Sequence, residues 1–112
     1  QRIADRIREI LSEMLIKEIS DPRLAQVNIT DVTVDRELAY ANIFVSCMEG
    51  SIRSKEILEG FDHASGFLRK ELAARVDLCS FPRLRFHWDP TPENADHIER
   101  LLNTIKNEDR SG

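Results

Sequence analysis

The segment DHASGFLRK, Asp62 to Lys70, lies inside a stretch that predicts one long amphipathic helix, residues 53–76. Apolar residues recur there at the three-and-four spacing of one helical face, at Ile57, Phe61, Ala64, Leu68, Leu72 and Val76. Gly66 interrupts the pattern, and a glycine inside a helix costs about 0.5–1 kcal/mol relative to alanine. The segment therefore predicts a kink at Ser65 and Gly66, between two helices of about ten residues each.

Three small residues in a row leave little side chain over the backbone here: Ala64, Ser65 and Gly66. Arg69 and Lys70 follow within one turn. Exposed backbone lets a large, flat partner approach, and two nearby cations favour phosphate. Two interpretations stay open: a contact site for a polyanion, or a tolerated glycine beside two solvated cations.

The length of 112 residues predicts one domain, which we place at residues 1–107, with a frayed end at 108–112. Hydrophobic residues make up 41% and charged residues 32%, as is typical of a globular domain with a modest core. No apolar run approaches the roughly 18 residues of a membrane helix, and no secretory signal is evident. These features predict a cytoplasmic protein without a membrane partner. Cys47 and Cys79 are expected to be reduced core residues.

Positive charge is concentrated in one part of an acidic chain. The net charge is −4 overall, yet residues 63–88 carry a net charge of +3. The cations of this region are Arg69, Lys70, Arg75, Arg83 and Arg85. A local field steers a polyanion more than the total charge does, so we predict phosphate contacts from this cluster. The alternative is that these cations only form surface ion pairs with neighbouring carboxylates.

The remaining periodicities predict an α+β fold. Residues 2–19 form an amphipathic pattern typical of a helix, and residues 27–34 and 39–47 read as the two strands of a hairpin. Residues 83–88 alternate cleanly and predict a third strand. A long helical connection precedes that strand, which favours a parallel crossover and a three-stranded mixed sheet packed by helices.

Side-chain parity predicts two details of the sheet. The inward set changes parity between Ile29 and Val32, which predicts a β-bulge at Thr30–Asp31. Tyr40 and Phe44 share the face of the second strand opposite its aliphatic residues. For this pair we favour a second small core, with a base-stacking platform on an open face as the alternative.

A last helix is predicted to run to about Asn107. Thr91 is expected to be its N-cap and Pro92 its first residue. Its apolar residues are expected to face inward: Ala95, Ile98, Leu101, Leu102 and Ile105.

The sequence lacks the usual patterns of enzymes and metal sites. It contains no phosphate-binding glycine loop, no HExxH and no nucleophile beside a base. His63, His87 and His97 are not spaced with the cysteines as a zinc site requires. We therefore predict no catalytic residue, no metal and no cofactor.

The order helix, strand, strand, helix-kink-helix, strand is that of a type II KH domain, with one helix added at the end. KH domains clamp nucleic acid with a GXXG loop between two central helices. Here that position holds Ala64, Ser65 and Gly66, which resembles the Ala-x-Gly element of the bacterial ribosome-binding factor A family. Four stretches carry the resemblance: EISDPRL at Glu18–Leu24, LAYANIFVS at Leu38–Ser46, ASGFLRKEL at Ala64–Leu72 and PRLRFHWD at Pro82–Asp89.

The resemblance implies a monomeric, non-enzymatic factor that binds the 30S ribosomal subunit and 16S rRNA. It implies support of late 30S assembly and of 16S rRNA 5′-end processing, above all in the cold, with an assembly GTPase as a candidate partner. It places the RNA contact at Ala64, Ser65 and Gly66, with Arg69 and Lys70 in the following helix. Arg75, Arg83 and Arg85 join this set on the charge argument alone. A KH-like protein-interaction module, or a small α+β enzyme that does not act on rRNA, stays open as the alternative.

Overall fold

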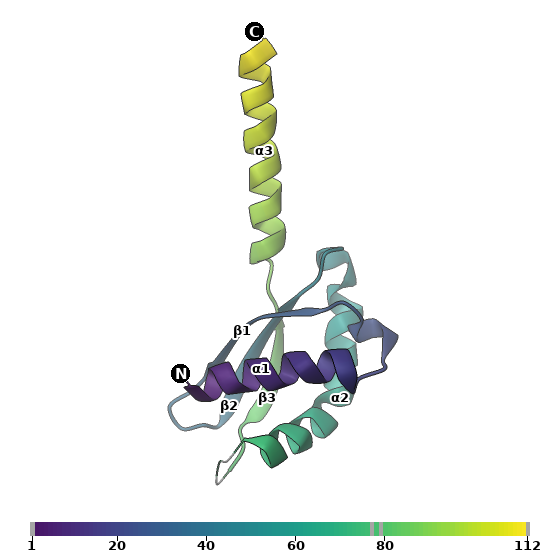
Figure 1. The fold of residues 1–112 in the computed structure, drawn as a ribbon, viewed down its shortest axis with the longest axis vertical. Helices are drawn as coiled ribbons and strands as arrows, with labels where there is room; N and C mark the ends of the chain where they lie inside the picture. The colour runs from purple at the N-terminus through teal and green to yellow at the C-terminus, as the bar shows by residue number, and fades with distance from the viewer. Residues whose placement is uncertain (1, 77, 79, 112) are drawn as a thin grey trace.

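The computed structural model describes residues 2–76, 78 and 80–111. Figure 1 shows a body of helices and strands from which one helix projects. The elements follow the chain in this order: α1 (Arg2–Lys17), η1 (Pro22–Leu24), β1 (Asn28–Val34), β2 (Tyr40–Ser46), η2 (Ser51–Arg53), α2 (Ser54–Arg75), β3 (Arg83–Trp88) and α3 (Thr91–Ser111). This order confirms the predicted α+β fold of the type II KH kind.

The three strands form a mixed sheet in the order β1-β2-β3. β1 and β2 are antiparallel, and β3 runs parallel to β2 after the crossover through α2, as predicted. The register of β1 against β2 shifts between Ile29 and Asp31, so the predicted bulge at Thr30–Asp31 is confirmed. The extra residue restores the inward direction of Val32, which is why both halves of β1 contribute to the core.

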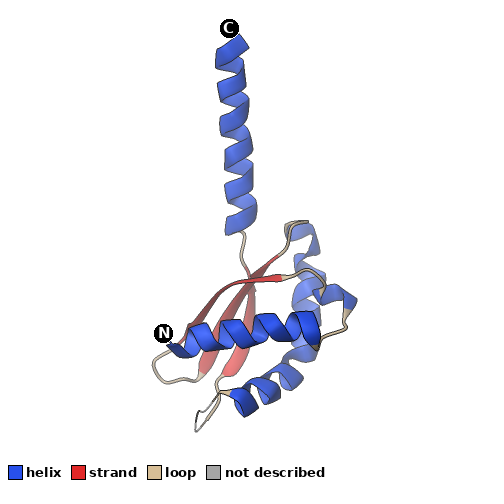
Figure 2. Ribbon diagram, viewed as in Figure 1, coloured by secondary structure: helices blue, strands red, loops and turns tan. Residues whose placement is uncertain are grey.

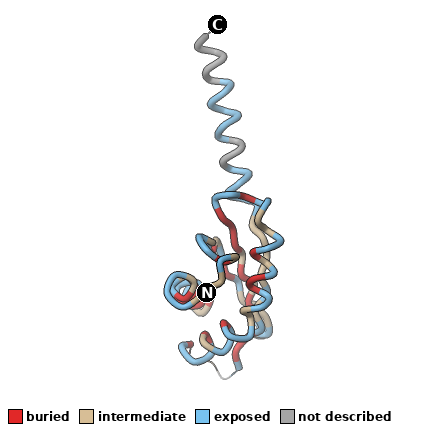
Figure 3. The backbone as a smooth tube through the Cα atoms, turned by 90° about the vertical axis from the view of Figure 1, so that its right-hand side faces the viewer, coloured by how far each residue is buried: buried red, intermediate tan, exposed pale blue. Residues whose placement is uncertain are grey.

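One face of the sheet carries the core. Residues opposite one another across the strands share a face, and the rows Ile29–Val45–Trp88 and Val32–Ile43–Phe86 lie on the same side. α1 packs on β1 and α2 packs on β3, and the apolar residues of both helices join this cluster. Figure 3 shows the buried backbone gathered in the body and the described part of α3 exposed. Both helices therefore cover one face and leave the other face of the sheet without a helix.

α2 is one continuous helix from Ser54 to Arg75, and Figure 2 shows it bending partway along without a break. We predict a kink at Ser65 and Gly66 between two helices of about ten residues each; the structure has one continuous helix of 22 residues that bends. The Ser65 hydroxyl donates to the carbonyl oxygen of Asp62 across 2.9 Å. A side-chain bond of this kind competes with the helical ladder and favours bending.

α3 corrects three predictions. It begins at Thr91, and the Asp89 carboxylate accepts a hydrogen bond from the Thr91 N–H, so Asp89 supplies the capping contact that we predicted for Thr91. It continues to Ser111, beyond the predicted end at Asn107. Its described apolar residues do not face inward: Ala95, Leu101, Leu102 and Ile105 are exposed. Ile98 lies outside the residues whose side chains are described.

Two further observations concern the cysteines and the character of the helices. Cys47 is buried and unpaired, as predicted, and Cys79 lies outside the described residues. Over the ranges given above, no helix combines the length and the apolar character that crossing a bilayer requires.

Candidate nucleic-acid interface

A groove runs between α2 and the free edge of β3. Its cavity of about 320 Å³ is lined by Leu58, Asp62, Ser65, Leu84, Arg85, Phe86 and His87. Phe86 stacks on the buried ring of Phe61, with centroids 4.4 Å apart, and this pair fixes the distance between helix and strand. Because β3 is an edge strand, its outer backbone groups face the groove.

A second hollow, of about 340 Å³, opens on the next residue of the helix. It is lined by Gly66, Arg69, Lys70, Ala73 and Phe81. Ser65 lines the first hollow and Gly66 lines the second, so these two residues lie between the hollows. The predicted small-residue window lies at the boundary between them.

Gly66 has no packing role among the described residues. A Cβ built at Gly66 meets nothing within 4 Å, and its backbone is helical. By contrast, a Cβ at Gly60 would come within 2.9 Å of Leu24 Cδ2 and 3.2 Å of Arg23 Cβ. Gly60 is thus required by packing, whereas Gly66 leaves backbone open to a molecule outside the chain. Ala64 is half-buried and packs against the core, so it positions the window rather than contacting solvent fully.

The structure divides the five predicted cations into two groups. Arg69 is held by the chain itself: its Nη2 donates to the Phe81 carbonyl across 2.8 Å and its Nε to the Pro82 carbonyl across 3.3 Å. This contact fastens the second half of α2 to the two residues that precede β3. Arg69 is therefore placed at the window but has a structural role there.

Arg75 is the second cation with a structural partner. It pairs with Glu18 at 2.6 Å and with Glu71 at 3.4 Å. The Glu18 hydrogen bond raises the pKa of Arg75 above its ordinary value, and desolvation acts against it. This agrees with the ion-pair alternative for Arg75.

The remaining cations are available to a ligand. Lys70 and Arg83 are exposed and have no ionic or hydrogen-bonding side-chain partner within the described chain. Arg85 is exposed as well, and its guanidinium lies 3.5 Å from the centroid of the Tyr40 ring. Lys70, Arg83 and Arg85 border the two hollows and the sheet face next to them.

The face of the sheet away from the helices is open, which corrects the second small core that we favoured for Tyr40 and Phe44. Phe44 stacks on His87 at 5.1 Å, and His87 Nε2 lies 2.9 Å from Asn42 Oδ1. Sequence reasoning did not single out Asn42 or His87 as site residues. The strict alternation of both strands was the signal that places them on this face.

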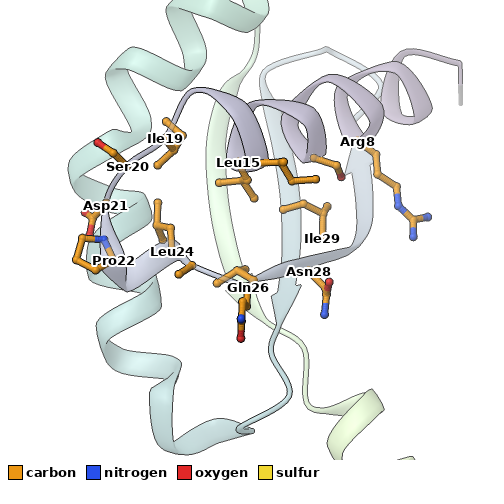
Figure 4. A pocket seen from close by; sticks show the side chains of 14 residues that line it. Arg8, Leu15, Ile19, Ser20, Asp21, Pro22, Leu24, Gln26, Asn28 and Ile29 are labelled. Atoms are coloured by element: carbon orange, nitrogen blue, oxygen red, sulfur yellow. The ribbon is translucent and has the colours of Figure 1, made fainter.

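A larger hollow, of about 620 Å³, lies elsewhere, between the end of α1 and the start of β1 (Figure 4). Its lining is mostly apolar or neutral, with Leu15, Ile19 and Leu24 at its centre and Arg8 at one end. Asp21 beside it is occupied by Arg23, whose side-chain hydrogen bond lowers the pKa of that carboxyl. This hollow offers little charge to a polyanion. No group of three or more His, Cys, Asp or Glu side chains in the described ranges is placed to hold a metal ion.

The fold and the groove define a KH-like α+β domain in which a small-residue helix segment replaces the GXXG loop. The family model described as "Ribosome-binding factor A" matches residues 1–102. The chain belongs to the ribosome-binding factor A family.

Individual relatives agree with this assignment. The chain is 42% identical over 110 residues to ribosome-binding factor A of Alcanivorax borkumensis, covering 97% of this chain and 80% of the relative. The crystal structure of ribosome-binding factor A from Thermus thermophilus has a similar fold, with a TM-score of 0.70 at 22% identity over 78% of this chain and 91% of that one. A homology model of the Thermus thermophilus factor, fitted into a cryo-electron-microscopy map of a 30S complex, gives a TM-score of 0.61 at 23% identity over 74% and 87% of the two chains.

Proposed function

We propose that this protein binds the 30S ribosomal subunit through 16S rRNA and acts as a monomeric, non-enzymatic assembly factor. In this role it supports late maturation and 16S rRNA 5′-end processing in the cytoplasm, with an assembly GTPase as its partner for release. Membership of the family supports the proposal, as does the similar fold of a relative fitted into a 30S complex.

The observation that carries the proposal is the open backbone at Gly66. No Cβ contact in the chain explains this glycine, and hollows lie on both sides of the Ser65–Gly66 pair. A nucleic-acid backbone can approach this point closely because no side chain stands in its way. Lys70 lines the hollow that contains Gly66, and Arg83 begins β3 on the open face of the sheet, both with unneutralised charge. The phosphates of a strand that crosses the window and the start of β3 therefore gain two cationic contacts.

The negative charge of the rest of the protein limits the orientations in which it can bind RNA. Residues 63–88 carry a net charge of +3 and the rest of the chain carries −7, so the attraction for a polyanion is strongest near the window and β3. Such a protein binds in one orientation and forms few non-specific complexes. The contact is therefore expected to be small and oriented.

Co-sedimentation with 30S subunits over a salt series tests the proposal. The double variant Lys70→Gln/Arg83→Gln removes two of the three available cations, and it is expected to lower the slope of log affinity against log salt by about 2. The matched control is Arg8→Gln/Lys55→Gln, which removes two exposed, unpartnered cations from α1 and the first turn of α2. The control should keep the wild-type slope. A wild-type slope in the site variant, or no co-sedimentation of the wild-type protein, would contradict the proposal.

A second experiment separates an assembly factor from an enzyme. Cells whose only copy carries the site variant should accumulate 16S precursor with an unprocessed 5′ end, most strongly in the cold. The purified wild-type protein should leave isolated precursor intact. Cleavage of isolated precursor by the protein alone would favour the enzyme alternative.

A further inference from the structure

We propose that the open face of the sheet is a second RNA contact, which stacks unpaired bases on two planar units carried by β2 and β3. The first unit is Arg85 on Tyr40, and the second is His87 on Phe44 with Asn42 beside it. This inference rests on the proposed function in that RNA is the ligand. It assigns a base-binding role to Tyr40, Asn42 and Phe44, which line neither hollow, and extends the contact from Arg85 and His87 at the edge of the groove onto the open face.

The first unit is a cation that lies over an aromatic ring. The Arg85 guanidinium carbon lies 3.5 Å from the Tyr40 ring centroid, close enough for a cation–π contact. Arg85 is exposed and has no carboxylate partner among the described residues. One side of the guanidinium plane is thus covered by the ring, and the other side is offered to solvent. A nucleobase can stack on that free side while the charge attracts its phosphate.

The second unit combines stacking with hydrogen bonding. The His87 and Phe44 rings are stacked at 5.1 Å with an interplanar angle of 28°. His87 Nε2 lies 2.9 Å from Asn42 Oδ1, and this contact fixes the orientation of the imidazole. The two N–H donors of the Asn42 amide remain available to a ligand. An amide next to a stacked ring pair supplies the donors that recognise the edge of an unpaired base.

The surroundings favour RNA bases over internal packing. The row that contains Phe44 and His87 ends on β1 at Asp31, whose carboxylate accepts a hydrogen bond from the Val32 N–H. The row that contains Asn42 and Arg85 ends at the exposed Thr33. β2 and β3 contribute cationic, aromatic and amide groups to this face and no carboxylate. Such a composition is typical of a surface that binds single-stranded nucleic acid.

The spacing of the two units sets the kind of RNA. Tyr40 and Phe44 are four residues apart on one strand, which is roughly 13 Å at about 3.3 Å per residue. Two separated bases of one flexible strand can reach both units. A regular duplex keeps its bases stacked inside and cannot present them. The predicted ligand is therefore an unpaired stretch of RNA.

The test measures binding of the full chain to a single-stranded RNA decamer of mixed sequence. Three further ligands are compared with it: the same decamer with abasic positions, the decamer as a duplex, and 30S subunits. Tyr40 is the only tyrosine, so its ring resonances report the site directly by NMR. The wild-type protein should bind the decamer with shifts at Tyr40, Asn42 and His87. The abasic decamer and the duplex should each bind about tenfold more weakly or worse.

Arg85→Lys isolates stacking from charge, because lysine keeps the cation and loses the plane. We expect about tenfold weaker binding of the decamer by this variant, with an unchanged salt slope. Arg36→Lys, at an exposed arginine in the hairpin turn, is the matched control and should bind as the wild type does. Equal binding of the abasic and intact decamers, or wild-type affinity in Arg85→Lys, would overturn the proposal.

The two proposals fail in different ways. If the wild-type protein co-sediments with 30S subunits but does not bind the decamer, the function stands and the base-stacking site is wrong. If Arg85→Lys weakens 30S binding while no decamer binds, the face contacts the subunit without stacking unpaired bases, which also overturns the base-stacking proposal. If the protein does not co-sediment at all, the proposed function itself fails.

Discussion

The hydroxyl of Thr30 lies 2.7 Å from Asp89 Oδ2 and donates a hydrogen bond to it, which ties the β-bulge of β1 to the residue that follows β3. The same carboxylate accepts the N–H of Thr91 across 2.9 Å. The β-bulge that the change of side-chain parity predicts thus also holds the residues that connect β3 to α3.

This relationship predicts how the pKa of Asp89 responds to mutation. The Thr30 hydrogen bond, followed by that of the Thr91 N–H, lowers the pKa of Asp89 below its ordinary value of 3.8. Thr30→Val removes the larger cause, so the pKa of Asp89 should rise towards 3.8. NMR titration of the Asp89 carboxyl carbon measures this shift, and an unchanged pKa in the variant would show that the contact has no electrostatic effect.

The same carboxylate predicts a pH-dependent stability. Because the folded pKa of Asp89 is depressed, its contribution is present above 3.8 and is lost as the pH falls through the folded pKa. Asp89→Asn should lower the free energy of unfolding by about 1 kcal/mol at neutral pH. Urea denaturation should show this difference shrinking in acid. A difference that is constant with pH would contradict the assignment.

Two glycines of α2 should respond in opposite ways to alanine. Gly66→Ala should raise the free energy of unfolding by about 0.5–1 kcal/mol, because the site is open and helical. Gly60→Ala should lower it by about 1–2 kcal/mol, because the new methyl group meets Leu24 and Arg23. Urea midpoints measure both. Gly66→Ala should nevertheless weaken 30S co-sedimentation, and unchanged binding would remove the functional reason for this glycine.

Substitutions of the neighbouring cations Arg69 and Lys70 in α2 should affect different properties, Arg69 the stability of the fold and Lys70 the binding of RNA. Arg69→Ala should lower the free energy of unfolding by about 1 kcal/mol, because the Phe81 and Pro82 carbonyls lose their donor. Lys70→Ala should change it by less than about 0.5 kcal/mol. In salt titrations of 30S binding, Lys70→Ala should lower the slope and Arg75→Gln should not. The opposite pattern would mean that the carbonyl contacts of Arg69 and the ion pairs of Arg75 do not set their roles.

The apolar residues of α3 should contribute little to the stability of the body. Leu101 and Leu102 are 51% and 53% exposed, so Leu101→Ser/Leu102→Ser should change the free energy of unfolding by less than about 0.5 kcal/mol. Leu68→Ala, at a fully buried site of α2, is the control and should cost about 2–5 kcal/mol. A large loss in the α3 variant would show that this helix packs on the body in solution.

Local rules predicted the sheet from the sequence because they depend on neighbours in the chain. Parity places the bulge at Thr30–Asp31, and a long helical connection implies the parallel pairing of β2 with β3. The same rules were insufficient for α3. Helical periodicity shows which residues share a face, but it does not show whether that face meets another element.

The candidate site was predicted in part. Ser65 and Gly66 of the small-residue window line two neighbouring hollows, and Lys70 and Arg83 have no side-chain partner among the described residues. Their contact with RNA stays a prediction. Arg69 and Arg75 differ because their partners lie far along the chain, at Phe81–Pro82 and at Glu18. A charge count along the sequence cannot show which cations the folded chain already uses.

Because α3 projects from the body, a small rotation at its base moves its far end by a larger distance. Its 21 residues span about 31 Å at 1.5 Å per residue, and the bonds near its start include those of Asp89 with Thr91 and of Glu93 with Ser51. A rotation of about 10° at Pro90 would sweep the far tip through roughly 5 Å, given that length. Small adjustments where β3 ends are thus magnified at the distal end of the molecule.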